Sequence, residues 1–387
     1  MTKPPIPYGR QHISQDDIEA VTEVLKSDFL TQGPKVQAFE EKFAEYIGSK
    51  YAVAVSNGTA ALHLSALALG VKPCDKVITT PITFAASANS VLYCGGEIDF
   101  ADIDPDTFLI DLDKLEEKLE AAPKGSYKGI IPVDFAGLPV NTEKLRKIAD
   151  KYGLWIIEDA CHAPGGYFMN SKDEKVHCGN GRYADLSIFS FHPVKHIATG
   201  EGGMITTKDK ALYEKLLMLR THGITKDPDL LEENHGGWYY EMQTLGYNYR
   251  LPDLSAALGI SQLQKADAGL ERRRKIADRY TEAFQNSGIK IQSTPAGFSN
   301  AYHLFVIRTS RRKELYNFLR ENNIFVQVHY IPVHLHPYYK SLGFKKGDFP
   351  NAEKYYEECL SLPMYPSLKD DEQEYVIDKI LDFLKDE

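Results

Sequence analysis

The feature that most constrains the fold is a regular alternation of short apolar runs with helical segments between residues 51 and 207. Seven runs rich in valine and isoleucine read YAVAV, KVITT, EIDFADI, GIIPVDF, LWIIED, LSIFSF and GMITT. Amphipathic or alanine-rich segments such as TAALHLSALAL and NTEKLRKIADKYG lie between them. Near-continuous apolar runs are typical of strands buried on both faces. The pattern predicts an α/β domain with a mainly parallel sheet covered by helices.

The pattern changes after Leu251. A long charged helix is expected over roughly residues 256–286, followed by a strand in AYHLFVIRTS, a helix in RKELYNFLRENN, a strand in IFVQVHYIP and a final helix after Pro366. The 387 residues exceed the length at which a single core stops growing. We therefore expect an N-terminal segment (residues 1–15), a large domain (16–260) and a smaller α+β domain (261–387).

The composition limits the kinds of binding partner and the cellular compartments that are expected for this chain. The formal net charge of −9 argues against nucleic acid or an anionic membrane as the main partner. The first residues, MTKPPIPYGRQHISQDD, lack the apolar region of a signal peptide, and no apolar stretch is long enough to span a bilayer. Five cysteines without framework spacing suit a reducing cytoplasm. A soluble cytoplasmic enzyme or binding protein is expected.

Two groups at strand ends point to a flat, phosphorylated ligand. In VSNGTAALHL a strand ends near Val55 and a helix begins near Thr59, with Ser56 or Asn57 available as the cap. The free amides of that helix, with Gly58 allowing close approach, predict a phosphate cradle; an ordinary capped turn is the alternative. In TTPITFAASAN, Phe84 follows another strand and could stack on a flat ligand or simply pack in the core.

Two charged groups occupy other strand ends. In LWIIEDACHAPGG, Glu158 and Asp159 follow four apolar residues, and a carboxylate there is costly unless it is paired, so a cationic partner is expected. A helix cap or internal salt bridge is the alternative. Lys195, between Val194 and His196, precedes Gly-Glu-Gly-Gly. Apolar surroundings lower the pKa of a lysine and make it a candidate Schiff-base nucleophile, although a loop lysine is otherwise ordinary surface.

Together, the four groups at the strand ends are more specific than any one of them alone. Asp159 and Lys195 stand on two different strand ends, with the phosphate cradle and Phe84 upstream. A carboxylate for a pyridinium proton, a lysine for an imine, a stacking aromatic and a phosphate cradle are what pyridoxal 5′-phosphate (PLP) requires of a protein. Gly200, Gly202 and Gly203 are expected to leave room beside the lysine for a ligand.

The chain resembles the DegT/DnrJ/EryC1/StrS group of sugar aminotransferases, which have the fold type I, aspartate aminotransferase-like architecture. The resemblance covers nearly the whole length and is carried by SDFLTQGPKVQAFEEKFAEYIGSKYAVAVSNGTAALHL, TTPITFAASANSVL, IIEDACHAPGG, LSIFSFHPVKHIATGEGGM, GYNYRLPDLSAALGISQL and LSLPMYP. It implies that Lys195 holds PLP covalently, that Asp159 partners the pyridine nitrogen and that Phe84 stacks on the ring.

The same resemblance assigns the remaining cofactor contacts. It implies that Gly58, Thr59 and Ser190 hold the phosphate, and that His162 lies near the phenolic oxygen of the ring. It also implies that Asn248, in the Gly-Tyr-Asn-Tyr-Arg motif, reaches the phosphate from the neighbouring subunit. The active form is then expected to be a homodimer with shared active sites.

By the same resemblance, the enzyme transfers an amino group, usually from glutamate, to a nucleotide-linked keto-sugar. IPYGRQHISQDDIEAV and VDFAG are most similar to the 4-aminotransferases of pseudaminic acid biosynthesis, which act on UDP-4-keto-6-deoxy-N-acetyl-L-altrosamine. Perosamine-type GDP-sugars and dTDP-sugars stay open as substrates, as does a non-catalytic PLP-binding regulator. A related dehydratase would have histidine in place of Lys195, and a Schiff-base aldolase would not need the phosphate cradle.

Two Cys-His pairs and one histidine-rich stretch suggest other functions. Cys161–His162 and His177–Cys178 carry zinc-ligand types, but each pair is contiguous and lacks Cys-x-x-Cys spacing, so no metal is expected. The stretch HYIPVHLHPYYKSLG contains His329, His334 and His336. We expect it to line the substrate entrance or to form a solvated loop.

Overall fold

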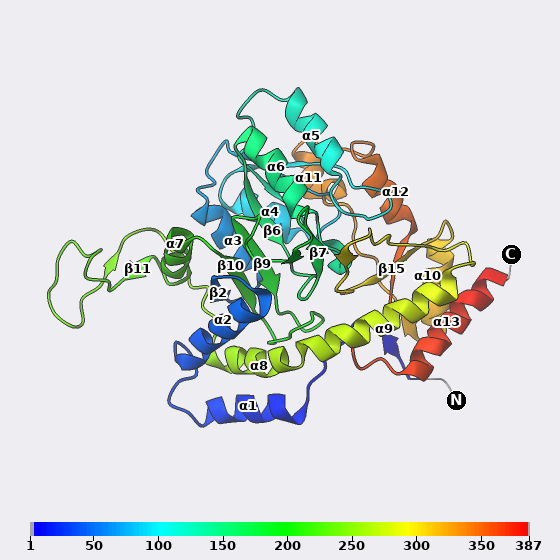
Figure 1. Ribbon diagram of the computed structural model, residues 1–387, viewed down its shortest axis with the longest axis horizontal. Helices are drawn as coiled ribbons and strands as arrows, with labels where there is room; N and C mark the ends of the chain where they lie inside the picture. Colours follow the sequence, from blue (N-terminus) through cyan, green and yellow to red (C-terminus); the bar gives the residue numbers. More distant parts are fainter. Residues whose placement is uncertain (1–3, 386–387) are drawn as a thin grey trace.

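A computed structural model describes residues 4–385 and shows a central sheet flanked by helices, with a second group of elements at one end (Figure 1). The strands of the central sheet are β2 (Tyr51–Val55), β3 (Lys76–Thr79), β4 (Glu97–Phe100), β5 (Gly129–Ile131), β6 (Trp155–Asp159), β9 (Leu186–Ser190) and β10 (Gly203–Thr207). Each of the seven predicted apolar runs contains one of these strands.

The sheet has the order β2-β10-β9-β6-β5-β3-β4. The pairs from β9 through β6, β5 and β3 to β4 are parallel, whereas β10 is antiparallel to both β9 and β2. The prediction of a mainly parallel α/β sheet is therefore confirmed, with β10 as the exception. Since β10 runs against both neighbours, β2 and β9 point the same way as the parallel set, and their carboxyl ends share one edge.

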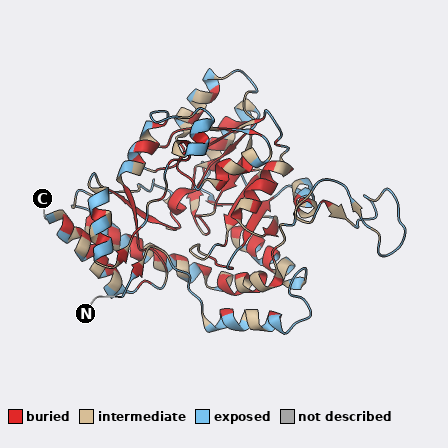
Figure 2. Ribbon diagram, turned by 180° about the vertical axis from the view of Figure 1, so that it is seen from behind, coloured by how far each residue is buried: buried red, intermediate tan, exposed pale blue. Residues whose placement is uncertain are grey.

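Helices cover both faces of this sheet because its strands present apolar side chains on both sides. In β2, Val53 and Val55 belong to one buried cluster, while Ala52 and Ala54 belong to another. Figure 2 shows the resulting buried strands between partly buried helices. The covering helices are α2 (Pro34–Ile47), α3 (Gly58–Ala68), α4 (Ala86–Tyr93), α5 (Leu112–Ala121), α6 (Thr142–Tyr152) and α7 (Lys210–Arg220).

A second group of elements follows the sheet along the chain and has its own buried cluster. Its three-stranded antiparallel sheet has the order β13-β15-β17. Its elements are α9 (Ala266–Phe284), β13 (Lys290–Ile291), β15 (Phe305–Arg308), α10 (Arg312–Glu321), β16 (Ile324–Phe325), β17 (Cys359–Leu362) and α13 (Asp370–Lys385). Helices α11 (Pro337–Ser341) and α12 (Pro350–Glu358) lie in the same part of the chain, but their buried residues Tyr339, Ala352 and Tyr355 belong to the cluster of the central sheet. The N-terminal strand β1 (Ile6–Pro7) pairs in parallel with β16, so the start of the chain is attached to this group.

Two element predictions in this half were wrong in extent. The long helix expected over residues 256–286 is two helices, α8 (Asp253–Gln264) and α9, because Lys265 leaves helical geometry with φ −111° and ψ 9°. Helix α1 (Gln15–Leu25) packs on α8. The strand expected in IFVQVHYIP is limited to the two residues of β16. Beyond them the chain makes one isolated bridge, between Gln327 and Ser361.

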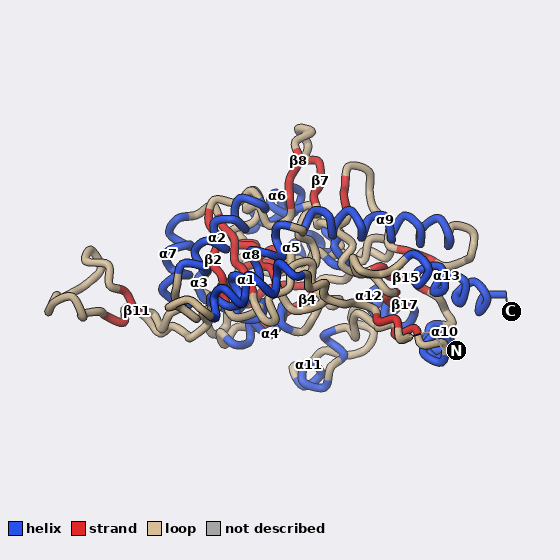
Figure 3. The backbone as a smooth tube through the Cα atoms, turned by 90° about the horizontal axis from the view of Figure 1, so that it is seen from below, coloured by secondary structure: helices blue, strands red, loops and turns tan. Residues whose placement is uncertain are grey.

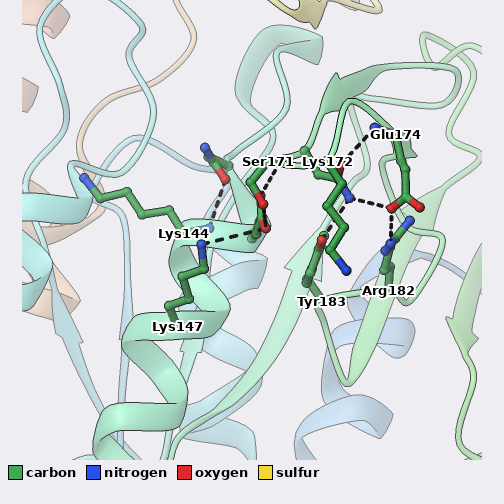
Figure 4. A network of polar contacts seen from close by, with 10 residues as sticks. Lys144, Lys147, Ser171, Lys172, Glu174, Arg182 and Tyr183 are labelled. Carbon is green, nitrogen blue, oxygen red and sulfur yellow. Dashed lines mark hydrogen bonds and ion pairs between the residues drawn. The ribbon is translucent and has the colours of Figure 1, made fainter.

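Two hairpins project from the body (Figure 3). The first, β7 (Tyr167–Met169) and β8 (Lys175–His177), also pairs with β14 (Phe298–Ser299). Polar contacts hold its turn (Figure 4): the Ser171 hydroxyl donates to Glu143 over 2.6 Å, and Arg182 pairs with Glu174. The second hairpin is β11 (Ile224–Thr225) and β12 (Glu241–Met242). In residues 4–385 no helix is both long and apolar enough to cross a membrane.

Candidate active site

The carboxyl ends of the parallel strands border a cavity of about 910 Å³. Residues at the ends of β2, β6 and β9 and after β3 form its floor, and residues 327–330 with Tyr8 form an opposite wall. Seven of the eight residues predicted for the site line this cavity, namely Gly58, Thr59, Phe84, Asp159, His162, Ser190 and Lys195. Elements distant in sequence thus bring these side chains to one edge of the sheet.

The eighth residue, Asn248, is not among those that line the cavity. It is exposed and forms an isolated bridge with Thr221. Thr221 and Arg250 border a second cavity of about 550 Å³ beside α2. Within a single chain Asn248 therefore does not line the cavity that the other seven residues share, although the adjacent Tyr249 does, and its contact with cofactor phosphate stays a prediction that requires a second subunit.

The amino end of α3 forms one end of the cavity. Asn57 caps the helix, since its side-chain oxygen accepts the Ala60 amide over 2.8 Å. The first amides of a helix have no intrahelical acceptor, so those of Gly58 and Thr59 are available to an anion. A Cβ on Gly58 would lie 3.0 Å from the Ser190 Cβ, so glycine lets the helix end approach the Ser190 hydroxyl.

Asp159 is the last residue of β6 and is only 5% exposed. Its Oδ2 accepts the Ser87 hydroxyl over 2.7 Å, and its Oδ1 accepts the Cys161 amide over 3.2 Å. Ser87 in turn lies 2.7 Å from the Thr83 hydroxyl. These contacts fix the direction of the carboxylate toward the cavity. Ser87 lies inside the TTPITFAASAN stretch, but nothing in its spacing singled it out.

Lys195 follows β9 in a turn, where its amide donates to the His192 carbonyl over 2.8 Å. Burial lowers the pKa of its ammonium group, and Asp159 opposes that shift. A lysine with a lowered pKa more readily supplies the neutral amine that attacks a carbonyl. The floor of the cavity therefore places a nucleophile near an oriented carboxylate.

His162 lies on the same floor and is held from two directions. The Ala136 amide donates to its Nδ1 over 3.3 Å, and the Tyr330 hydroxyl lies 3.4 Å from its Nε2. Burial, and then the charge of Lys195, lower the pKa of His162 well below its usual value, so the ring is neutral near pH 7. Its neighbour His303 packs against it with ring centroids 4.3 Å apart. A neutral ring with a protonated Nε2 can donate to a ligand oxygen.

The wall contains residues that the sequence did not reveal. Tyr8 packs beside His329 with ring centroids 5.1 Å apart, and Tyr330 lies 6.2 Å from Phe84 by the same measure. Of the three histidines noted in this stretch, His329 lines the cavity. His334 does not form an entrance or a solvated loop, because it is completely buried and lies 3.0 Å from the Glu353 carboxylate.

Two of the glycines after Lys195 have a structural role other than the expected one of leaving room for a ligand. A Cβ on Gly202 would lie 2.3 Å from the Thr199 hydroxyl, and a Cβ on Gly203 would lie 2.5 Å from the Asn57 carbonyl. The two glycines let the chain pack against itself and against the turn before α3, so they do not leave space for a ligand. Gly200, with φ +81°, is the one of the three with open space around it.

Glu158 also differs from expectation. In place of the expected cation, it has the carboxyl group of Asp134 and the thiol of Cys178 as neighbours. One oxygen or sulfur atom from each of the three side chains lies within 4.8 Å of the other two. This group lies among buried residues, and neither His162 nor His177 belongs to it. The costly buried carboxylate predicted at this strand end is therefore paired with another acid.

The cavity has the groups that PLP requires. Two free helix amides and the Ser190 hydroxyl suit a phosphate, the oriented carboxylate of Asp159 suits a pyridinium N–H, and Lys195 suits a covalent bond to the aldehyde. Phe84, 64% exposed, presents its ring to the same cavity. The residues present fit the cofactor.

Comparison with known proteins agrees with this chemistry. The model of the DegT/DnrJ/EryC1/StrS aminotransferase family matches residues 11–381. Spore coat polysaccharide biosynthesis protein SpsC of Bacillus subtilis is 41% identical over 389 residues, which cover 98% of this chain and 97% of that protein. The UDP-4-amino-4,6-dideoxy-N-acetyl-beta-L-altrosamine transaminase of Campylobacter jejuni is 39% identical over 384 residues, with 98% and 97% covered.

A solved structure gives the same result for the fold. A Streptococcus pneumoniae protein assigned as a sugar aminotransferase, in its PLP form, superposes with a TM-score of 0.90 at 29% identity and covers 99% of both chains. The fold type I architecture expected from the sequence is thereby confirmed. The chain belongs to the DegT/DnrJ/EryC1/StrS family and is a PLP-dependent sugar aminotransferase.

Proposed function

We propose that the enzyme transfers an amino group from glutamate to C4 of UDP-4-keto-6-deoxy-N-acetyl-β-L-altrosamine, a step of pseudaminic acid biosynthesis. The observation that carries this proposal is the match over almost the whole of both chains to the Campylobacter jejuni transaminase named for that amino sugar. All five cysteines are free, which supports a cytoplasmic, reducing location.

The floor of the cavity gives each residue a task in this reaction. Bound PLP supplies an acceptor for the electrons released when a substrate C–H bond breaks. Asp159 keeps the pyridine nitrogen protonated, and the amides of Gly58 and Thr59 hold the phosphate. Lys195 Nζ would hold the cofactor covalently and, as a free amine, would be the base that moves the proton during transamination. His162 donates from Nε2 to the phenolic oxygen.

We further propose that the enzyme is a homodimer in which Asn248 completes the partner's phosphate site. The exposure of Asn248, and its absence from the cavity lining that the other seven residues share, support this arrangement. Separately inactive Lys195→Ala and Asn248→Ala proteins would be mixed under subunit exchange. Heterodimers then place both lesions in one site and leave the other intact, so activity should return. Verified heterodimers that stay inactive would place Asn248 in its own subunit's site.

A second substrate class is favoured by a specific observation. SpsC, at 41% identity, is named for spore coat polysaccharide biosynthesis. That name points to a polysaccharide pathway and specifies neither nucleotide nor sugar, so another UDP-, GDP- or dTDP-linked keto-sugar, such as a perosamine-type substrate, is the alternative acceptor.

A substrate panel separates the two candidates. UDP-, GDP- and dTDP-linked 4-keto-6-deoxy sugars would each be incubated with glutamate, and the product identified by mass spectrometry and NMR. Amination at C4 of the UDP-altrosamine precursor, well above the rates with the other sugars, is the expected result. Preference for a GDP- or dTDP-sugar would replace the proposed substrate. Cofactor binding without amination of any sugar would favour a non-catalytic PLP-binding regulator.

A further inference from the structure

The two carboxyl groups that end β6 have opposite surroundings. Asp159 faces the cavity and accepts hydrogen bonds from Ser87 and from the Cys161 amide. Glu158, one residue earlier, points to the other side of the strand, where its Oε2 accepts the Ser187 hydroxyl over 2.8 Å and the Gly179 amide over 3.0 Å. Facing Glu158 there is Asp134, which follows β5. The end of β6 thus directs Asp159 to the cofactor cavity and Glu158 to a second buried acid, Asp134.

The contact between Asp134 and Glu158 lacks a donor. Asp134 is 0% exposed and Glu158 is 5% exposed. Oδ1 of Asp134 accepts the Val140 amide over 2.8 Å, but its Oδ2 is buried without a hydrogen-bond partner. In residues 4–385, no lysine or arginine donates a hydrogen bond to either carboxyl group, and the nearby thiol of Cys178 is only a weak donor.

Two ionised carboxylates in this position would repel each other, and an acceptor would be left unsatisfied in the interior. A proton on one carboxyl removes the repulsion and supplies the missing donor. We propose that Asp134 and Glu158 share one proton and act as a single hydrogen-bonded pair that positions the cofactor-binding residues. Burial, followed by the charge of Glu158, raises the pKa of Asp134 well above its usual range, which agrees with this arrangement.

The pair is connected to the cavity through Asp134. The Asp134 amide donates to the Asp159 carbonyl over 3.0 Å, so the acid at the pyridine nitrogen and the acid of the pair are joined by backbone. The Ala136 amide, two residues on, is the donor to His162 Nδ1. Fixing the side chain of Asp134 therefore fixes the loop that orients both Asp159 and His162. The effect of the Asp134–Glu158 pair on cofactor binding rests on the proposed roles of Asp159 and His162, whereas the existence of the shared proton does not.

Infrared spectroscopy tests the proton directly. At about pH 8 ordinary carboxyl groups, with pKa near 4, are ionised, so a remaining C=O band of a protonated carboxyl reports a buried proton. The holoenzyme is expected to show this band. Asp134→Asn and Glu158→Gln should each abolish it, because an amide then supplies the donor to the remaining carboxylate without a titratable proton.

Matched controls separate the pair from other buried groups. Asp102 is 6% exposed, but each of its two oxygens already has a donor, since they accept the Asn351 and Ala352 amides, each over 2.9 Å. Asp102→Asn and Cys178→Ala should leave the band unchanged. The proposal is overturned if the wild-type protein lacks the band, if either pair variant keeps it, or if metal analysis finds one divalent ion per chain that both pair variants lose.

Cofactor affinity tests the positioning role. Apo-protein would be titrated with PLP and followed by absorbance. Asp134→Ala, which removes the hydrogen bond, should weaken binding roughly tenfold, whereas Asp134→Asn should bind almost as the wild type does. Equal affinity for both variants would overturn the positioning role, and if Asp134→Ala does not fold, the Asn and Gln variants still decide the infrared result. Neither measurement uses a sugar substrate, so a wrong substrate assignment leaves both interpretable.

Discussion

The floor and the wall of the cavity are built in different ways. The floor consists of strand ends and the first turn of a helix, where Asp159 and Ser190 end buried strands and Lys195 follows one. The wall consists of irregular chain, residues 327–330 and Tyr8, which lie more than three hundred positions apart in the sequence yet meet at the same cavity. The floor therefore presents groups held by regular structure for the chemistry of the cofactor, whereas the side chains of the wall are carried by irregular chain.

The largest effect should follow from removing the nucleophile of the floor. Lys195→Ala is expected to reduce turnover by about 10⁴-fold or more, because it removes both the covalent attachment and the base that moves the proton. Steady-state assays with the best substrate of the panel would measure the loss. Turnover within about tenfold of the wild type would place the base elsewhere.

Asp159→Asn should have the next largest effect. The amide keeps the size of the side chain but no longer favours a protonated pyridine nitrogen, so turnover should fall by about 10²–10³-fold. Cofactor retention should change less, since the phosphate contacts and Lys195 remain. Absorbance of the purified variant measures retention. A variant that loses the cofactor but turns over normally when saturated with it would make Asp159 a binding residue only.

A wall residue should have a smaller and different effect. Burial raises the pKa of Tyr330, so its hydroxyl stays protonated and can donate to substrate or interact with His162. Tyr330→Phe should raise KM for the sugar about fivefold and leave kcat within about twofold. Because neither Tyr330 nor His162 titrates near pH 7, the change should be the same from pH 6 to about pH 8. A fall in kcat comparable to that of Asp159→Asn would remove the distinction between wall and floor.

The smallest effect should come from the charges on the β7–β8 hairpin, far from both regions. Glu174→Gln removes the negative charge that pairs with Arg182, but water and salt screen exposed pairs of this kind, so they contribute little to stability. Thermal unfolding should shift by a few degrees at most, and kcat/KM should not change. A large loss of activity in this variant would show that distant surface changes also affect catalysis. The activity losses of the other variants could then not be assigned to the floor or to the wall.

The same contrast explains how far the sequence could predict the structure. Val/Ile-rich runs between amphipathic segments have few alternatives to a buried parallel sheet, so all seven strands were located, and with them the residues at their ends. Tyr8 and Tyr330 could not be found in this way, because no periodicity links segments that meet only in the folded chain. The pairing of Glu158 with Asp134 was also missed, since a buried acid suggests a cation unless a shared proton is considered. The break at Lys265 had no proline or glycine to mark it.

The claim on which the account depends most is that Lys195 is the residue that binds PLP. The holoenzyme would be reduced with borohydride and digested with trypsin, and the peptide that carries the phosphopyridoxyl group would be sequenced by mass spectrometry. The account predicts the label on Lys195 in at least most of the protein. A label on Lys208 or Lys210, which follow β10 beyond the glycine loop, would contradict it.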